Sequence, residues 1–422
     1  MIAETKQRIE QIQRGEVPEK YRKRASGIVP CDWAEYSLGE IYKERKLAGD
    51  PRQPILTVSI HSGVSDGALN ENELGKKVKR IEDKTQYKTA KAGDLVFNMM
   101  RAWQGAIGVA RSDGLVSPAY IVARPEREVF PLYMDYYMKQ PRMVNMIHRQ
   151  SYGVTDFRLR LYWNSFAQIQ ISLPPIAEQK RIVEILSTQD RIVELLEKKV
   201  EQLQLLKKNC LRKLFPRNGS SVPDIRFPGF TAPWEQRKLG ELYETLSERN
   251  TDSLPYDKTL SVATMTYKTD GNGAADSSLA NYKRLRIGDI AFEGHTSKEF
   301  RYGRFVLNDV GDGLMSPRFS ALRPKFEMSI LFWKYYIHYE PIMRRILVCS
   351  TKAGTMMNEL VVHDFFQNIL LVPSEAEQEK IGGVLASLDS LIALHRRKCE
   401  EEKQKKKVLM QLLLTGIVRV NA

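Results

Sequence analysis

The chain has 422 residues, of which 42% are hydrophobic and 27% charged, a composition typical of soluble globular proteins with more than one domain. Its four cysteines show no Cys-x-x-Cys spacing, which argues against a zinc knuckle and a disulfide framework. No run of about 18 apolar residues occurs, so we expect no transmembrane helix and a cytoplasmic protein. The formal net charge of +14 favours a polyanionic partner, although some soluble proteins are simply basic.

The first predicted elements are a short helix and a basic connector. Residues 1–14 carry charged and apolar side chains in a helical pattern, which Gly15 ends. Residues 20–24 are mostly basic and are predicted to lead into a globular half that begins near Ile28.

The first globular half, up to about residue 173, is mixed and rich in strands. Short apolar or β-branched runs bounded by Gly, Pro and Asp predict strands over 54–60, 94–97, 107–110 and 168–173. A helix is predicted over residues 132–147. The second half follows the same order, from a strand over 259–262 to a final strand over 368–372.

The second half of the sequence repeats the first at a distance of about 200 residues, too long for a solenoid of small units. The matching segments are Leu38-Gly39-Glu40 and Leu239-Gly240-Glu241, Gly93-Asp94 and Gly288-Asp289, Leu115-Val116-Ser117-Pro118 and Leu314-Met315-Ser316-Pro317, and Ala177-Glu178-Gln179 and Ala376-Glu377-Gln378. The repeat therefore indicates two whole domains. Its Gly-Asp pair suits a tight turn before a strand, and we interpret it as structural. Two similar domains present two similar surfaces, which favours a partner with two sites.

A long helix is predicted after each half. The first follows Pro174-Pro175, with Glu178 near its positive end, and in the second Ser374 and Glu377 have the spacing of a capping box. Apolar residues in steps of three and four form a helix-pairing seam on each, namely Leu186, Val193, Leu196, Val200 and Leu203, and Leu385, Leu388, Ile392, Leu409 and Leu412. Gln189 and His395 are polar positions in these seams, and the polar stretch 400–407 interrupts the second. The seams most simply bury each other, antiparallel. The alternative is that each helix packs on its own domain.

The sequence contains no recognisable catalytic or cofactor motif. It lacks a phosphate-binding Gly-x-x-x-x-Gly-Lys-Ser/Thr loop, the Asn/Asp-Pro-Pro-Tyr/Phe tetrapeptide of amino-methyltransferases and a Gly-rich dinucleotide turn. The six histidines are scattered, and His395 with Cys399 would supply only two ligands from one helix. Asp270-Gly271-Asn272-Gly273 lacks the downstream Glu of a calcium loop and is interpreted as a turn. We therefore predict no catalytic residue and no metal or cofactor site in this chain.

Basic, aromatic and amide side chains gather in loops that differ between the two copies. The candidate DNA-binding residues are Arg101, Trp103, Gln104, Arg158 and Arg160 in the first copy, and Lys298, Arg301, Tyr302, Arg304, Lys352, Thr355 and Asn358 in the second. Arg, Gln and Asn side chains read purine edges, whereas Lys and backbone N–H groups hold phosphates. Each residue alone is better explained as a solvated surface charge, but as a set they favour a DNA-binding surface. A shared framework with different loops suits two sites with different targets.

The chain resembles the specificity subunits of type I restriction–modification enzymes along essentially its whole length. The resemblance rests on Leu173-Pro174-Pro175-Ile176-Ala177-Glu178-Gln179-Lys180-Arg181-Ile182 and Val372-Pro373-Ser374-Glu375-Ala376-Glu377-Gln378-Glu379-Lys380-Ile381, and on the segments Gly27-Ile28-Val29-Pro30 and Ile225-Arg226-Phe227-Pro228 that precede Trp33 and Trp234. The second copy departs from the family's Pro-Pro at Pro373-Ser374.

The resemblance implies an α+β fold with two tandem pseudo-repeated α/β target recognition domains. Long helices that pair as an antiparallel coiled coil separate and follow these domains. The expected divisions are an N-terminal helix and connector (1–27), recognition domain 1 (28–173), a central helix (174–216), recognition domain 2 (217–372) and a C-terminal helix (373–422).

The resemblance also implies a non-catalytic subunit in which each recognition domain reads one half of a split DNA target. The helices would set the spacing and dock two methyltransferase subunits, which supply S-adenosylmethionine chemistry on adenine. Restriction subunits, where present, would add ATP- and Mg-dependent cleavage. The alternative is a stand-alone DNA-binding regulator with two modules. A single-chain restriction enzyme would need catalytic motifs that the sequence lacks.

Overall fold

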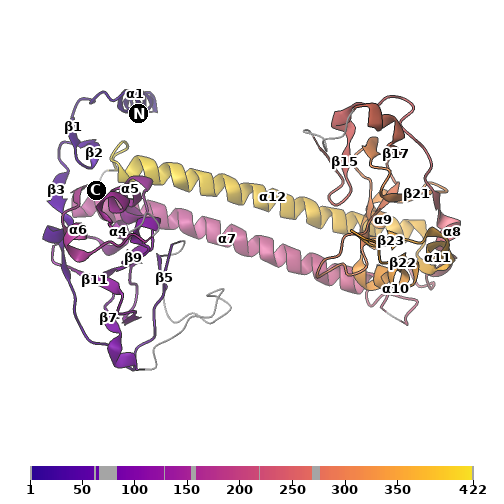
Figure 1. The fold of residues 1–422 in the computed structure, drawn as a ribbon, viewed down its shortest axis with the longest axis horizontal. Coiled ribbons are helices and arrows are strands. Elements are labelled where there is room, and N and C mark those ends of the chain that lie inside the picture. The colour runs from indigo at the N-terminus through magenta and orange to yellow at the C-terminus, as the bar shows by residue number, and fades with distance from the viewer. Residues whose placement is uncertain are drawn as a thin grey trace. The chain divides into compact units, whose positions relative to one another are not determined.

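A computed structural model describes residues 2–60, 63–65, 83–127, 129–153, 158–217, 219–268 and 276–420 (Figure 1). Their contacts divide into two compact units: unit 1 comprises residues 1–195 and 399–422, and unit 2 comprises residues 196–398. Both divisions fall inside the long helices, so each unit contains one globular half with parts of both helices. The predicted turn at 270–273 lies outside the described residues.

Unit 1 begins with helix α1 (Ile2–Gln13) and a hairpin of strands β1 (Tyr21–Arg24) and β2 (Gly27–Pro30). The basic segment predicted as a connector is therefore mostly a strand. It is ordered because Arg22 donates to the backbone oxygen of Trp33 at 2.7 Å and Arg24 forms an ion pair with Glu35 at 3.0 Å. The expected domain limit at residue 28 cuts this hairpin.

The centre of unit 1 is a four-stranded antiparallel sheet with strand order β4-β11-β8-β9. These strands are β4 (Tyr42–Glu44), β8 (Leu95–Asn98), β9 (Ile107–Val109) and β11 (Tyr120–Pro125). Smaller antiparallel pairs are β3 (Ala34–Ser37) with β12 (Gln170–Leu173), β7 (Lys88–Ala90) with β10 (Gly114–Val116), and β5 (Val58–Ser59) with β6 (Gly63–Val64). Every residue of β8 is buried, in keeping with its three apolar residues Leu95–Phe97. Of the strand predicted over 54–60, only Val58-Ser59 is formed.

Two helices take the place of the one predicted over 132–147. They are α4 (Pro131–Met138) and α5 (Pro141–Gln150), and the break falls before Pro141 because proline opens a helix but disrupts its interior. Short helices are α2 (Leu38–Ile41), α6 (Trp163–Ala167), η1 (Lys84–Gln86) and η2 (Ala102–Gln104). The core between sheet and helices contains Leu38, Phe97, Tyr133, Ile147 and Phe166, all fully buried.

Unit 2 repeats this topology, with a central sheet in the order β14-β21-β18-β19. Its strands are β14 (Tyr243–Thr245), β18 (Ile290–Glu293), β19 (Arg304–Leu307) and β21 (Ser320–Pro324). The smaller pairs are β13 (Glu235–Lys238) with β24 (Ile369–Val372), β15 (Leu260–Ser261) with β16 (Thr266–Tyr267), β17 (Lys283–Leu285) with β20 (Gly313–Met315), and β22 (Thr351–Lys352) with β23 (Glu359–Leu360). Its helices are α8 (Leu239–Leu242), α9 (Ile330–Tyr336), α10 (Glu340–Ser350), α11 (Val362–Gln367), η3 (Tyr256–Lys258) and η4 (Asp276–Asn281). The repeated sequence thus forms a repeated fold.

The repeated Ala-Glu-Gln motif anchors the starts of the long helices α7 (Ile176–Leu214) and α12 (Glu375–Leu414). Gln378 donates to the backbone oxygen of Pro373 at 3.0 Å, and the equivalent Gln179 makes the same contact with Pro174. The predicted capping box is wrong, because the Glu377 carboxylate binds Arg226 at 2.6 and 2.9 Å instead of the helix end. The ion pair between Glu377 and Arg226 therefore takes the place of the local cap.

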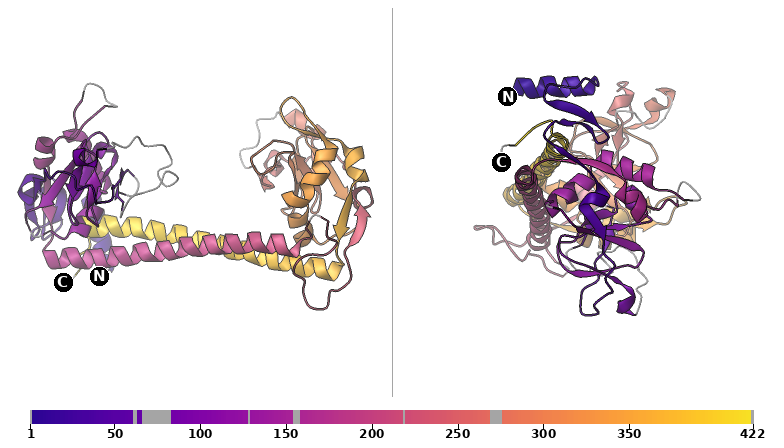
Figure 2. Two further views of the ribbon diagram at one scale, coloured as in Figure 1. Left: turned by 90° about the horizontal axis from the view of Figure 1, so that it is seen from below. Right: turned by 90° about the vertical axis from the view of Figure 1, so that its left-hand side faces the viewer.

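In unit 1 the start of α7 lies beside the end of α12 (Figures 1 and 2). Gln189 donates to the backbone oxygen of Glu402 at 3.1 Å, and Asp190 forms an ion pair with Lys406. The stretch 400–407, predicted to interrupt the seam, therefore continues the contact face with polar groups. Cys399 is buried on this helix, whereas His395, which was assigned to the seam, is only half-buried.

In unit 2 the end of α7 contacts the start of α12, where Lys207 binds both carboxylate oxygens of Asp389 at 2.7 and 2.8 Å. Among the predicted helix-pairing residues, Leu186, Leu203, Leu385, Leu388 and Ile392 are buried, and Val193, Leu196, Val200, Leu409 and Leu412 are half-buried. In unit 1 the start of α7 packs near the end of α12, with Leu186 in one cluster with Leu413. In unit 2 Leu203 packs with Ile392, and Leu214, farther along α7, lies in one cluster with Ile381. The two helices are therefore antiparallel within each unit. The supercoil of a coiled coil stays a prediction.

Candidate nucleic-acid interface

In unit 1 the candidate residues begin in the loop that joins β8 to β9. Asn98 ends β8, and its side-chain oxygen accepts the backbone N–H of Met100 at 3.0 Å, which turns the chain out of the sheet. Arg101 and Gln104 are exposed in this loop. Trp103 is half-buried against the core, and its indole N–H donates to the Met100 backbone oxygen at 3.0 Å. Arg101 and Gln104 are thus available to a partner, whereas Trp103 supports the loop.

A second segment of unit 1 joins this loop at the same end of the sheet. The backbone N–H of Leu161 donates to the Met99 oxygen at 2.9 Å, so the neighbouring Arg160 lies beside the loop. Arg158 and Arg160 are both exposed. The structure therefore brings the two predicted groups of unit 1 residues together.

Two tyrosines at this place were missed by the sequence analysis. Tyr152 and Tyr162 stack with ring centroids 5.0 Å apart, and 58% and 36% of their surfaces are exposed. They meet because Tyr152 and Arg160 form an antiparallel bridge. No short-range pattern in the sequence signals this contact. Exposed aromatic rings can stack on nucleic-acid bases, which suits the candidate interface.

In unit 2 the equivalent loop joins β18 to β19 and carries most of the predicted residues. Lys298 and Arg301 are exposed, and Tyr302 is half-buried. Arg304 differs, because its guanidinium donates to the Ala263 backbone oxygen at 3.2 Å and lies over the Phe300 ring at 5.0 Å. Its role in the structure is internal support.

The β22–β23 hairpin of unit 2 lies against this loop. The backbone N–H of Asn358 donates to the Gly294 oxygen at 2.9 Å, and its side-chain amide reaches the Arg301 oxygen at 3.4 Å. A Cβ atom on Gly294 would lie 2.0 Å from the Asn358 oxygen, so only glycine fits this approach. Lys352 forms an ion pair with Glu359 at 3.3 Å, and Thr355 is exposed. The predicted groups of unit 2 therefore also meet.

Glu293 and His295 complete this site and were also missed. Glu293 is the last residue of β18 and is buried, whereas the side chain of His295 is 59% exposed. The Glu293 carboxylate contacts the Nδ1 atom of His295 at 2.5 Å. The scattered spacing of the histidines gave no reason to single out His295, but its position after the repeated Gly-Asp strand could have done so.

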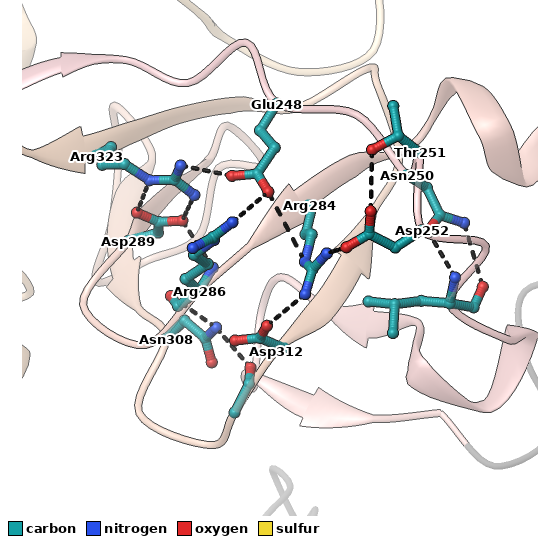
Figure 3. A network of polar contacts seen from close by, with 12 residues as sticks. Glu248, Asn250, Thr251, Asp252, Arg284, Arg286, Asp289, Asn308, Asp312 and Arg323 are labelled. Atoms are coloured by element: carbon teal, nitrogen blue, oxygen red, sulfur yellow. Dashed lines mark hydrogen bonds and ion pairs between the residues drawn. The ribbon is translucent and has the colours of Figure 1, made fainter.

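Other arginines of unit 2 are paired with carboxylates of the same domain (Figure 3). Arg323 forms two hydrogen bonds with the buried Asp289 at 2.8 and 2.9 Å and a third with Glu248 at 2.6 Å. The hydrogen bond from Arg286, followed by that from Arg323, lowers the pKa of the Glu248 carboxyl. Asp289 also accepts the Arg286 backbone N–H at 2.7 Å. These contacts support the structural interpretation of the repeated Gly-Asp pair.

Within the described residues, no group of three or more His, Cys, Asp or Glu side chains could hold a metal ion. His61 lies outside those residues. None of the described helices has both the length and the apolar character needed to cross a membrane.

This chain is similar in sequence to several known proteins. Residues 30–205 match the family model of the type I restriction modification DNA specificity domain. The putative type I restriction enzyme MjaX specificity subunit of Methanocaldococcus jannaschii is 24% identical over 434 residues, which cover 95% of this chain and 97% of that protein. The MjaVIII specificity subunit of the same organism is 24% identical over 332 residues, which cover 73% of this chain and 75% of that protein.

Solved structures show the same fold at low sequence identity. The S subunit of a type I restriction–modification system from M. genitalium gives a TM-score of 0.51 at 13% identity, covering 92% of this chain and 97% of that chain. A chain from a study of complex assembly and conformational transition in a type I system gives a TM-score of 0.54 at 16% identity, covering 92% and 99%.

Proposed function

We propose that this chain is a specificity subunit of a type I restriction–modification system and that it reads a divided DNA target with one half-site for each unit. The observation that carries this proposal is the pair of equivalent sheet ends after β8 and β18. Each presents exposed basic side chains on the same topology, but the loop sequences differ. Equal frameworks would suit both units to equivalent DNA backbones, and different loops would give them different bases to read.

Partner subunits would dock on the long helices. Several large apolar side chains there are exposed to solvent, among them Ile192, Leu195 and Val408 in unit 1, and Leu205, Leu206, Leu391 and Leu394 in unit 2, with exposed fractions of 36% to 59%. Exposed apolar groups on a helix favour burial against another chain. We propose that two methyltransferase subunits cover them, and that the chain itself carries no catalytic residue.

The proposed division of labour places every cofactor on the partners. S-adenosylmethionine would belong to the methyltransferase subunits, and ATP and Mg to restriction subunits where a system has them. The 39 residues of α7 correspond to about 58 Å of helix at about 1.5 Å per residue, and we propose that the helix pair sets the spacing between the half-sites.

Co-expression with an adjacent methyltransferase gene product tests this function. We expect a complex of two methyltransferase subunits with one copy of this chain, and genomic adenine methylation at a target of two short blocks with an unread spacer. The chain alone is expected to bind DNA weakly, with strong salt dependence. Tight, sequence-specific binding by the chain alone, with no complex formed, would support the stand-alone regulator instead.

A further inference from the structure

His295 lies in the candidate interface of unit 2 with its imidazole held from inside the domain. The buried Glu293 accepts the backbone N–H of His295 at 3.1 Å and contacts its Nδ1 atom at 2.5 Å. The side chain of His295 is nevertheless 59% exposed, in the same loop as Lys298 and Arg301. One ring nitrogen is therefore bound within the domain, and Nε2 remains for an outside partner.

Glu293, which contacts the imidazole of His295, is itself held in place. The second carboxylate oxygen of Glu293 lies 3.6 Å from Nε of Arg304, whose guanidinium is held by Phe300 and the Ala263 backbone oxygen. The backbone between Glu293 and His295 is pinned by the hydrogen bond to the Gly294 oxygen. A side chain held in advance loses little conformational freedom on binding. The imidazole of His295 is therefore preorganised for binding.

The hydrogen bond to Glu293 also determines whether the Nε2 atom of His295 donates or accepts a hydrogen bond. A carboxylate is only an acceptor, so Nδ1 carries the proton that is shared with Glu293. In the neutral imidazole the Nε2 atom then has a lone pair and accepts a hydrogen bond. A phosphate oxygen cannot donate to it, but the amino groups of adenine (N6) and cytosine (N4) in the major groove can.

The equivalent position in unit 1 supports a base contact over a backbone contact. Asn98 ends β8 and accepts the Met100 backbone N–H, just as Glu293 accepts that of His295. The turn is therefore shared, but the thioether of Met100 is only a weak hydrogen-bond acceptor and does not match the imidazole of His295. Both half-sites have the same phosphate backbone, so a group present in only one unit is suited to reading a base.

We infer that His295 is a specificity-determining residue of unit 2, whose Nε2 accepts a hydrogen bond from the exocyclic amino group of an adenine or cytosine. Glu293 is its positioning residue. This inference rests on the proposed function and assigns one contact within it.

The test uses the full chain assembled with its methyltransferase subunits, and compares wild type with His295→Ala, His295→Gln and Glu293→Ala. Methylation is mapped across a genome, and DNA binding is measured on the same complexes. We expect His295→Ala to relax one position of the unit 2 half-site, with discrimination reduced about fivefold, and to leave the unit 1 half-site intact. His295→Gln keeps an acceptor and should retain part of the discrimination. Glu293→Ala should relax the same position.

A base analogue without the exocyclic amino group at that position sharpens the test. It should weaken wild-type binding about fivefold and leave His295→Ala binding unchanged. His363→Ala is the matched control, because His363 is exposed on α11 outside the candidate interface, and it should change neither half-site.

Uniform weakening on all sequences, or an unchanged target for His295→Ala, would overturn the inference while the proposed function stands. Retention of the unit 1 half-site shows that each variant has folded and assembled. A wild-type complex without a two-part target would instead overturn the proposed function, and this inference with it.

Discussion

Arg419 holds Glu178 through two parallel hydrogen bonds, from Nε and Nη2 to the two carboxylate oxygens, each 2.8 Å long. Arg226 holds Glu377 in the same way in unit 2, and the two glutamate side chains are only 4% and 1% exposed. Arg419 follows the end of α12 and locks the start of α7, whereas Arg226 follows α7 and locks the start of α12. In each unit, the segment that follows one long helix therefore binds the start of the other long helix.

We expect Glu377→Gln to destabilise unit 2 by about 3 kcal/mol, because it removes the charged partner of Arg226, whose side chain is only 15% exposed. Chemical denaturation, followed by a signal from unit 2, measures this loss. Glu241→Gln is the control, because the Glu241–Arg237 pair is exposed in unit 2 and should contribute almost nothing. Equal stability of the two variants would show that the buried pair is not an anchor.

Acid should weaken unit 2 through Glu248. Arg286 and Arg323 lower the pKa of this carboxyl in the folded protein, so its stabilisation is complete above the unfolded pKa and is lost as pH falls through the folded pKa. Between about pH 5 and pH 3, wild type should therefore lose more unfolding free energy than Glu248→Gln. Denaturation curves at several pH values provide the test, and parallel losses in both proteins would contradict it.

Arg301→Ala and Arg304→Ala should have different effects although both residues were predicted to bind DNA. Arg301 is exposed, so its loss should weaken binding to targets that carry the unit 2 half-site, by about 1 kcal/mol or more if it reads a base. Arg304 supports the loop from inside, so its loss should lower the melting temperature. Binding and thermal unfolding, measured on both variants, separate the two roles. Identical behaviour of the variants would show that the structural distinction is wrong.

Leu205→Asp should prevent assembly without unfolding the chain. Leu205 is 59% exposed on α7, so the isolated chain tolerates the charge, but an apolar interface with a partner does not. Size-exclusion chromatography with the methyltransferase subunit measures the complex, and circular dichroism checks the fold. Gln204→Asp is the neighbouring control and should still assemble. An intact complex with Leu205→Asp would place the partner elsewhere.

Local sequence signals predicted much of the fold. The apolar spacing along α7 and α12 and the prolines that precede both helices are signals that a few neighbouring residues carry. The Gly-Asp turns recur in both copies. The continuous helix over 132–147 was wrong because apolar periodicity outweighed Pro141 in the interpretation, whereas the backbone follows the proline.

Long-range partners could not be predicted in this way. Glu178 and Arg419 are far apart in the sequence, and nothing near either residue identifies the other. The capping box at Ser374 failed for the same reason, because Arg226 competes for Glu377 from outside the helix. In the candidate interface, residue types pointed to Arg101 and Arg301 but could not separate them from the internally bound Arg304.

Exchange of one recognition domain tests most directly the claim that each unit reads its own half-site. Residues 34–173, from the start of β3 to the end of β12, are replaced by the equivalent domain of a relative with a known different target, and adenine methylation is mapped with the methyltransferase present. We predict that one half of the target changes to that of the relative, while the other half keeps its sequence. Simultaneous change of both halves, or no change in either, would contradict it.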